Sequence, residues 1–432
     1  MSKFVSRAKL LLLCASATVA TVGATPASAV SIVLNPDSSF TSSPNGAAAL
    51  LGFQKAANYW STVLTNDATI SFDIHFDALD DGVLGGTYSN YTYSSTSQVY
   101  QQLATTGTSS LDSVAVANLR PLTAAGGLGM RVPGTDPDGN MTTTLASSRY
   151  DSNDSFNNTT LVTNTAVAKA LGFAVDYDDA AFAGASFLST NVDGDITFSS
   201  NFDFDFDPTD GIDVGAYDFV GVAVHEIGHA LGFVSGTDDY DYYISHGGLT
   251  AEEGEDNAFA TTLDLFRYAT NGFDPDGSRS LQLDPNREAF FSIDGENPFN
   301  FNNQAEATSS FFATGYYLGD GNQASHWKDT QAILLANGCY VDERQVGIMD
   351  PTSSNCSLGI VTSNDLAAFD AMGWNLNMDI LNNKAYTFNT AQIFDLPFRA
   401  VPEAATWMQM IFGFGMIGSA MRRRMTMRLT RA

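Results

Sequence analysis

The feature that most constrains this chain is the stretch from His225 to Phe233, which reads HEIGHALGF. The run from Phe219 to Val224 before it is apolar apart from Gly221, and Asp218 stands in front as a candidate N-cap. These features predict a buried helix that ends at Gly232, where glycine can adopt a positive φ. Polar side chains inside such a helix need partners, because unpaired buried polar groups are costly.

A metal ion would supply those partners. His225 and His229 lie about one helical turn apart, so their imidazoles stack on one face and can reach one Zn²⁺ at about 2.0–2.1 Å. Glu226 lies about 100° round the helix axis, where it can hold a water at the metal and take its proton. The motif therefore predicts a catalytic zinc site. The alternative is a helix whose histidines are satisfied by ordinary hydrogen bonds.

A catalytic zinc normally has three protein ligands and one open position, and the sequence offers several candidates for the third ligand. The compact form of the motif would place it at Ser235, a poor zinc ligand, with Asp238 and Asp239 just beyond. The other candidates are distant histidines and acids in the segment 247–257, which we expect to be a solvated loop. They are Glu252, Glu253, Glu255, His246 and His326. Spacing alone leaves these alternatives open.

The order of motifs resembles that of leishmanolysin-like metzincins, and most closely that of bacterial metalloproteases with a PEP-CTERM sorting tail. The shared pattern is HEIGHALGF, a long insertion, Ser325-His326-Trp327, and then a turn containing Met349 in GIMDP. The resemblance implies that His326 is the third zinc ligand and that Met349 lies beneath the metal without bonding to it. Several metzincins have a tyrosine where Pro351 stands here, so we name no tyrosine as an oxyanion helper.

The same resemblance implies the fold class, which is an α+β catalytic domain over residues 30–375. It would be a metzincin-like, two-lobed zincin, with an upper mixed sheet in residues 30–232, a central HExxH helix, and a loop-rich lower lobe in residues 233–375. Periodicity adds local predictions. Apolar residues from Leu50 to Leu64 recur at helical spacing, whereas Ser113 to Leu119 alternates weakly and indicates a strand.

A stronger alternation runs from Gly194 to Phe206, just before the predicted metal helix. We expect a strand there whose edge, at Asp203–Asp207, pairs with extended substrate backbone. The acids of this region are expected to face solvent, but oxygen-rich loops also suit Ca²⁺, so a calcium site is an alternative. Its candidate ligands are Asp193, Asp195 and Asp207.

The start of the chain predicts export. Residues 1–29 read as a signal peptide with a basic start, an apolar run and the cleavage site Ala27-Ser28-Ala29, so that Val30 would begin the mature protein. Two cysteines, Cys339 and Cys356, remain after this segment is removed. An even pair in an exported protein predicts a disulfide, which would stabilise the fold by roughly 3 kcal/mol.

The end of the chain predicts a membrane tether. After an expected linker at 376–400, a Pro-Glu pair precedes an apolar run at 404–421 that is long enough to span a bilayer, and arginines follow it. Residues 401–432 thus resemble a PEP-CTERM sorting signal. The resemblance implies transient anchoring in the inner membrane of a Gram-negative bacterium and removal of the tail by an exosortase-type enzyme. A permanent anchor is the alternative.

Charge excludes one class of partner. Three of the 20 basic residues precede residue 30 and five follow Met421, which leaves 12 basic residues against 47 acids before the tail. A body this acidic repels nucleic acid. The features together predict a secreted zinc metalloendopeptidase that acts on protein or peptide substrates in the medium or cell envelope. The alternative is a non-catalytic surface or extracellular-matrix protein with a structural metal site, although the intact Glu226 argues against it.

Overall fold

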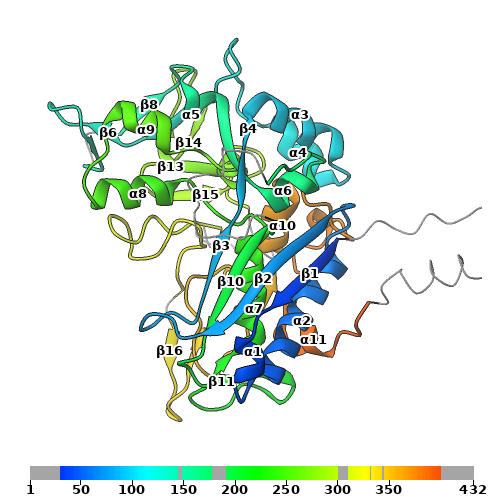
Figure 1. The fold of residues 1–432 in the computed structure, drawn as a ribbon. Coiled ribbons are helices and arrows are strands. Elements are labelled where there is room, and N and C mark those ends of the chain that lie inside the picture. The colour runs from blue at the N-terminus through cyan, green and yellow to red at the C-terminus, as the bar shows by residue number, and fades with distance from the viewer. Residues whose placement is uncertain are drawn as a thin grey trace, which may run out of the picture.

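The structure is a computed structural model that describes residues 30–144, 148–177, 191–299, 310–330, 332–342 and 345–399. The predicted signal peptide and the predicted sorting tail lie outside these residues. Within the described ranges, no helix is both long enough and apolar enough to cross a membrane. The described chain is an α+β protein, as expected, with one larger sheet and many short strands (Figure 1).

The largest sheet of the described chain has four strands in the order β1-β2-β10-β3. Their bounds are Ser31–Pro36 for β1, Thr69–Asp77 for β2, Gly194–Ser199 for β10 and Gly85–Ser89 for β3. The first three strands in this order run parallel, whereas β3 runs antiparallel to β10 and forms the edge. Every second residue of β2 is buried, as the two-residue period of a strand requires.

Helices α2 (Gly46–Val63) and α7 (Phe219–Ala230) contact the sheet and each other. The predicted helix at Leu50–Leu64 is therefore confirmed as α2. The rings of Phe198 on β10 and Phe219 on α7 lie 4.6 Å apart between centroids, and both side chains are fully buried. Large aromatic side chains bury much apolar area, so such contacts fix α7 against the sheet.

Short ladders and helices make up the rest of the described chain, and many of them lie at the end of the molecule opposite β11 and β16 (Figure 1). The two-stranded ladders are β4 (Tyr91–Ser95) with β9 (Thr160–Asn164), β5 (Met130–Val132) with β8 (Arg149–Asp151), β6 (Gly134–Thr135) with β7 (Met141–Thr142), β11 (Phe204–Asp205) with β12 (Tyr217–Asp218), β16 (Ala332–Leu334) with β17 (Tyr340–Asp342), and β18 (Ile360–Thr362) with β19 (Thr387–Asn389). A three-stranded sheet contains β14 (Arg279–Leu281), β13 (Arg267–Phe273) and β15 (Ala289–Phe291). The other helices are α1 (Ser39–Ser42), α3 (Thr96–Thr106), α4 (Ser110–Ala117), α5 (Phe156–Thr159), α6 (Thr165–Ala170), α8 (Thr237–Ser245), α9 (Ala251–Asn257), α10 (Ser363–Ala371) and α11 (Thr390–Asp395), with 3-10 turns η2 (Pro208–Asp210), η3 (Leu263–Phe266) and η5 (Ile380–Asn382).

The predicted edge strand at Asp203–Asp207 is wrong. Strand β10 is hydrogen-bonded on both sides, and the residues after it leave the sheet to form the short β11. The alternation continues across this break because both parts pack on the same ring. Phe198 and Phe204 have ring centroids 4.6 and 5.3 Å from that of Phe219. The open edge beside α7 belongs to β3 instead.

Two local predictions are wrong because helix caps outweigh the apolar pattern. Ser113–Leu119 was expected to be a strand, but most of it lies in α4, which begins with a capping box between Ser109 and Asp112. The segment 247–257 was expected to be a loop, but it contains α9, which begins with a capping box at Thr250. Reciprocal side-chain caps satisfy two backbone donors, so they favour a helix even where apolar periodicity is weak.

The expected linker at 376–400 is also largely ordered structure, since it contains η5, β19 and α11. It packs against helix α2. The rings of Tyr59 and Phe388 stack with 5.7 Å between centroids, and the Lys55 ammonium donates to the carbonyl of Leu396 at 2.9 Å. The described part of this segment is therefore attached to the body of the protein through short elements.

Candidate metal centre

Helix α7 carries the two motif histidines and is buried over most of its length. The Asp218 carboxylate caps it by accepting the N–H of Gly221 at 2.9 Å, and it also accepts the N–H of Gly359 and the hydroxyl of Thr390. Burial raises the pKa of Asp218 to about 6, and these hydrogen bonds oppose that rise. After the helix, Gly232 has a φ of 111°. The predicted cap and stop are both confirmed.

Three imidazoles meet beside this helix. Two belong to α7, and the third belongs to His326, which lies 97 residues after His229 in the chain. The Nε2 atoms of His225 and His229 are 3.0 Å apart. The Nε2 atom of His326 lies 3.2 Å from that of His225 and 3.0 Å from that of His229. The structure therefore brings together the two motif histidines and the distant histidine that the resemblance singled out.

The opposite nitrogen of each ring fixes its tautomer. The Nδ1 atoms of His225, His229 and His326 lie 2.7, 2.8 and 3.1 Å from the carbonyl oxygens of Ile348, Phe233 and Gln323. A carbonyl only accepts, so each Nδ1 must carry the proton and donate it. Each Nε2 is then left with its lone pair, and the three lone pairs face one another. A cation would turn this repulsion into attraction.

The set fits zinc. Tetrahedral coordination at a Zn–N distance of about 2.0–2.1 Å places ligand nitrogens about 3.3–3.4 Å apart, close to the spacing seen here. Burial lowers the pKa of His225 to about 4 and that of His326 to about 3, and it also lowers the pKa of His229. All three rings are therefore neutral at pH 7, which is the form that binds metal.

Two other candidates for the third ligand serve to position His326. Asp238 accepts the backbone N–H groups of Ala324 and Ser325 at 2.6 and 3.0 Å. The N–H of Ser235 donates to the Ser325 hydroxyl at 2.9 Å. The chain just after the metal helix thus holds the loop that delivers the third imidazole.

The remaining candidates point elsewhere. His246 is exposed, and its ring stacks on Tyr242 with 4.3 Å between centroids. Glu253 belongs to the capping box of α9, and Glu252 is exposed on the same helix. The Glu255 carboxylate accepts the side-chain amide of Asn153 at 2.7 Å. None of these belongs to the histidine group that could hold a metal.

Met349 lies against the metal helix, since a Cβ added to Gly228 would come within 2.5 Å of its sulfur. The buried Asp365 carboxylate accepts the N–H groups of Ile348 and Met349 at 2.9 and 3.3 Å, and the indole N–H of Trp327 at 2.8 Å. The N–H of Trp327 in turn donates to the carbonyl of Met349 at 3.0 Å. One carboxylate therefore ties the methionine turn to the segment that carries the third histidine.

Glu226 lies under the edge strand. Its carboxylate accepts the hydroxyl of Thr87 at 2.7 Å, and a Cβ added to Gly85 would lie 2.9 Å from the same carboxylate. Burial raises the pKa of Glu226 to about 7, which the Thr87 hydrogen bond opposes. Sequence analysis missed Thr87. Its only signal is the Gly85-Gly86 pair before it, which allows a backbone to approach closely.

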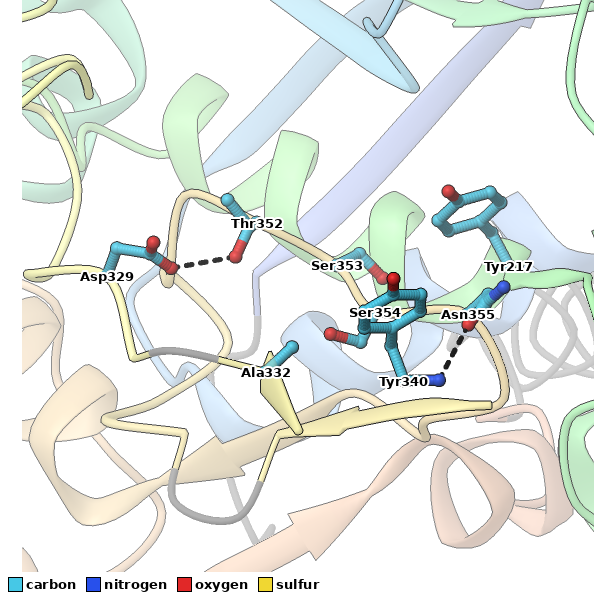
Figure 2. Close-up of a pocket in the computed structure, with 8 residues that line it drawn as sticks. All are labelled: Tyr217, Asp329, Ala332, Tyr340, Thr352, Ser353, Ser354 and Asn355. Atoms are coloured by element: carbon cyan, nitrogen blue, oxygen red, sulfur yellow. Dashed lines mark hydrogen bonds between the residues drawn. The ribbon is translucent and has the colours of Figure 1, made fainter. Parts of the chain in front are cut away.

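The predicted disulfide between Cys339 and Cys356 is present, with 5.5 Å between the Cα atoms. Next to it in the chain, Tyr340 and Asn355 help to line a surface pocket of about 430 Å³ (Figure 2). The other lining residues are Tyr217, Asp329, Ala332, Thr352, Ser353 and Ser354. The pocket contains none of the three clustered histidines, although its residues Asp329 and Thr352 follow His326 and Met349 closely in the chain.

The three acids considered for calcium do not come together. The Asp193 carboxylate accepts the Lys169 ammonium at 2.7 Å, and Asp195 contacts the ring of His75 at 3.1 Å. Asp207 caps the short η2 turn. Each carboxylate is thus engaged by its own protein partner, whereas Ca²⁺ needs six to eight oxygen ligands.

His75 gives the sheet a pH-dependent contact. Its ring nitrogens lie 2.9 Å from Asp37 and 3.1 Å from Asp195. Burial lowers the pKa of His75, but hydrogen bonds and charges of the two aspartates outweigh burial, so its pKa is raised. The resulting stability is complete below the unfolded pKa of about 6.5 and is lost as pH rises through the higher folded pKa.

We expect His75→Gln to remove this pH dependence. At pH 6 the unfolding free energy of the wild type should exceed that of the variant by up to about 1 kcal/mol. This is the stability that ion pairs near the surface usually contribute. The difference should shrink towards pH 9. Urea unfolding of both proteins at each pH measures it. A difference that grows with pH would contradict the assignment.

Comparisons with family models, with curated proteins and with solved structures found no match for this chain. Membership of a protease family therefore stays a prediction. The function is therefore inferred from the side chains of the site, from their distances and from their burial.

Proposed function

We propose that this protein is a secreted, zinc-dependent metalloendopeptidase. The observation that carries the proposal is the convergence of three Nε2 atoms within 3.2 Å, beside a carboxylate that follows one of them on the same helix. Among the described residues, no fourth ligand joins the group. Structural zinc sites are usually closed by four protein ligands, whereas catalytic sites keep one position open. This favours catalysis over a structural metal site.

The chemistry is divided between the metal and Glu226. Zinc held by His225, His229 and His326 would polarise the scissile carbonyl and acidify the attacking water. Glu226 accepts the proton from that water and later returns it to the leaving amine. Burial raises the pKa of Glu226, and the positive charge of a bound zinc ion would oppose that rise, so that the carboxylate can act as the base. Thr87 holds the carboxylate in place by donating its hydroxyl proton.

The edge of β3 offers a place for the substrate backbone. In the described chain β3 pairs only with β10, so its other side is open. Gly85 at one end lies against Glu226, and the Ser89 hydroxyl at the other end lies 3.4 Å from the carbonyl of His229. An extended peptide can add a strand to such an edge. In this proposal β3 takes the role that the sequence suggested for Asp203–Asp207.

The proposal includes a metzincin-like arrangement. Its support is the methionine turn at Met349 against α7, and a mixed sheet with an antiparallel edge strand beside the same helix. Residues 30–232 would form the upper lobe and residues 233–375 the lower lobe. The Met349 side chain would give the metal an apolar floor and would form no bond to it.

We also propose that the protein acts outside the cytoplasm, in the medium or in the envelope of a Gram-negative bacterium. The disulfide supports an oxidising compartment. The tail would anchor the chain transiently in the inner membrane until an exosortase-type enzyme removes it.

Metal removal tests the proposal. The purified protein is expected to contain one zinc per chain and to digest casein. A chelator should abolish the digestion and added Zn²⁺ should restore it, because the chain itself provides only the base. Metal analysis and a casein assay, with and without chelator, measure both. Bound zinc without cleavage of casein or of mixed peptides would favour the structural metal site.

A further inference from the structure

A second group of metal-ligating side chains lies away from the three histidines. Asp37, His75 and Asp77 each offer one ligand atom, and these atoms all lie within 4.8 Å of one another. His75 and Asp77 are two residues apart on β2, so their side chains point to the same face of the sheet. Asp37 follows the end of the neighbouring strand β1, and its N–H donates to the carbonyl of Ile74 at 3.3 Å. The backbone of two paired strands therefore holds the three side chains together.

This group is separate from the proposed catalytic centre. The residues that alternate with His75 on β2 are buried, and the ring of one of them, Phe76, lies 6.2 Å from that of Phe219 on α7. Successive side chains of a strand point to opposite faces, so His75 and Asp77 point away from α7. An ion bound by this group would therefore lie on the face of the sheet opposite to the metal helix.

The ring of His75 is oriented as that of a metal-ligating histidine usually is. Its Nε2 atom lies 3.1 Å from the Asp195 carboxylate on β10, and its Nδ1 atom lies 2.9 Å from the Asp37 carboxylate. An ionised carboxylate only accepts, so Asp195 fixes a proton on Nε2. Nδ1 is the nitrogen that remains for an ion, which would take the place of the proton between Nδ1 and Asp37. A carboxylate on the second ring nitrogen is a common support of a ligating imidazole.

The surroundings of His75 favour a cation. Asp73 precedes it by two residues on β2 and lies opposite Asp195 in the ladder with β10. Together with Asp37 and Asp77, four carboxylates thus share this face with one imidazole. The side chains of His75 and Asp37 are only 26% and 39% exposed, so water screens their charges incompletely. A divalent cation would relieve the repulsion between these acids, because it becomes the largest local charge.

We propose that Asp37, His75 and Asp77 form a second, exchangeable site for a divalent transition-metal ion such as Zn²⁺. One imidazole nitrogen and two carboxylate oxygens suit such an ion, whereas Ca²⁺ and Mg²⁺ prefer oxygen ligands alone. Asp77 is exposed, so water can fill the remaining coordination positions. With one imidazole in place of three, the site binds zinc more weakly than the three-histidine centre and fills only when zinc is in excess. The ion would tie β1 to β2, independently of the proposed function.

The test is a calorimetric titration of the purified protein after it has been loaded with one equivalent of Zn²⁺. We expect a second Zn²⁺ to bind at least about tenfold more tightly than Mg²⁺, because imidazole favours zinc. Loss of a residue that only supports a ligand usually lowers metal affinity about 10–100-fold. Asp195→Ala leaves the three ligands in place and should show a loss in this range. His75→Gln removes a ligand, so its affinity for the second zinc should fall further.

Asp77→Asn and Asp67→Asn are a matched pair of variants. Each removes one charge from an exposed side chain near one end of β2, so both should fold. Asp77→Asn should weaken binding of the second zinc at least about tenfold, since it changes a direct ligand, whereas Asp67→Asn should leave it unchanged.

Three outcomes would overturn the second site. They are the absence of a second zinc in the wild type, equal zinc affinities of Asp77→Asn and Asp67→Asn, and binding in His75→Gln as tight as in the wild type. Either of the last two would leave only general attraction of cations to an acidic protein. Differences between variants assign the signal to this site. A protein that binds zinc here but not at the three histidines would therefore contradict the proposed function alone.

Discussion

Glu226→Gln should retain zinc and lose at least about a hundredfold in the rate of peptide hydrolysis, the usual contribution of a general base. The amide has nearly the shape of the carboxylate, and its oxygen can still accept the Thr87 hydroxyl. The amide is far too weak a base to take the proton of the attacking water. The three imidazoles are untouched, so metal binding should not change. Hydrolysis of a quenched fluorescent peptide, together with metal analysis, measures the two effects separately.

Loss of activity in Glu226→Gln should not result from unfolding of the variant. Burial raises the pKa of Glu226 to about 7, which means that the metal-free fold disfavours the charged carboxylate. A neutral glutamine removes that cost, so the variant should be at least as stable as the wild type. Glu252→Gln is the matched control, because Glu252 is exposed on α9 away from the histidine group. Activity within tenfold of the wild type in Glu226→Gln would contradict the assigned role.

Helix α7 could be predicted because it depends on interactions between residues that are close in sequence. The apolar run, the Asp218 cap and the Gly232 stop act within a few residues of one another, and all three take the predicted form. The same kind of physics explains two errors. Reciprocal caps begin α4 and α9 where periodicity indicated a strand and a loop, since a cap of two hydrogen bonds outweighs a weak pattern.

The parts that sequence analysis missed depend on pairing between distant segments. The alternation before α7 correctly indicated a strand, but nothing in it states that β3 would take the edge and leave β10 inside. Thr87 meets Glu226 only through that strand order. Likewise, spacing left the third ligand open. His326 is delivered by contacts with Asp238 and Asp365, and both residues lie far from it in sequence.

His326→Ala tests whether this long-range delivery creates the metal site. Mutation of a residue that merely supports a metal ligand usually lowers metal affinity about 10–100-fold. His326→Ala removes a direct ligand, so we expect a larger loss of zinc affinity. Two imidazoles on one helical turn remain, and they cannot close the coordination of the ion alone. Peptide hydrolysis should fall with the bound zinc. Competition with a zinc indicator dye measures the affinity.

His246→Ala is the matched control, since it removes an exposed imidazole that stacks on Tyr242 and belongs to no ligand group. It should bind zinc like the wild type. Circular dichroism should show both variants folded, because Asp238 and Asp365 hold the loop on either side of residue 326 through Ala324, Ser325 and Trp327. If His326→Ala bound zinc as tightly as His246→Ala, the ion would have to sit on the helical pair with some other partner, and the convergence of three imidazoles would be a packing feature only.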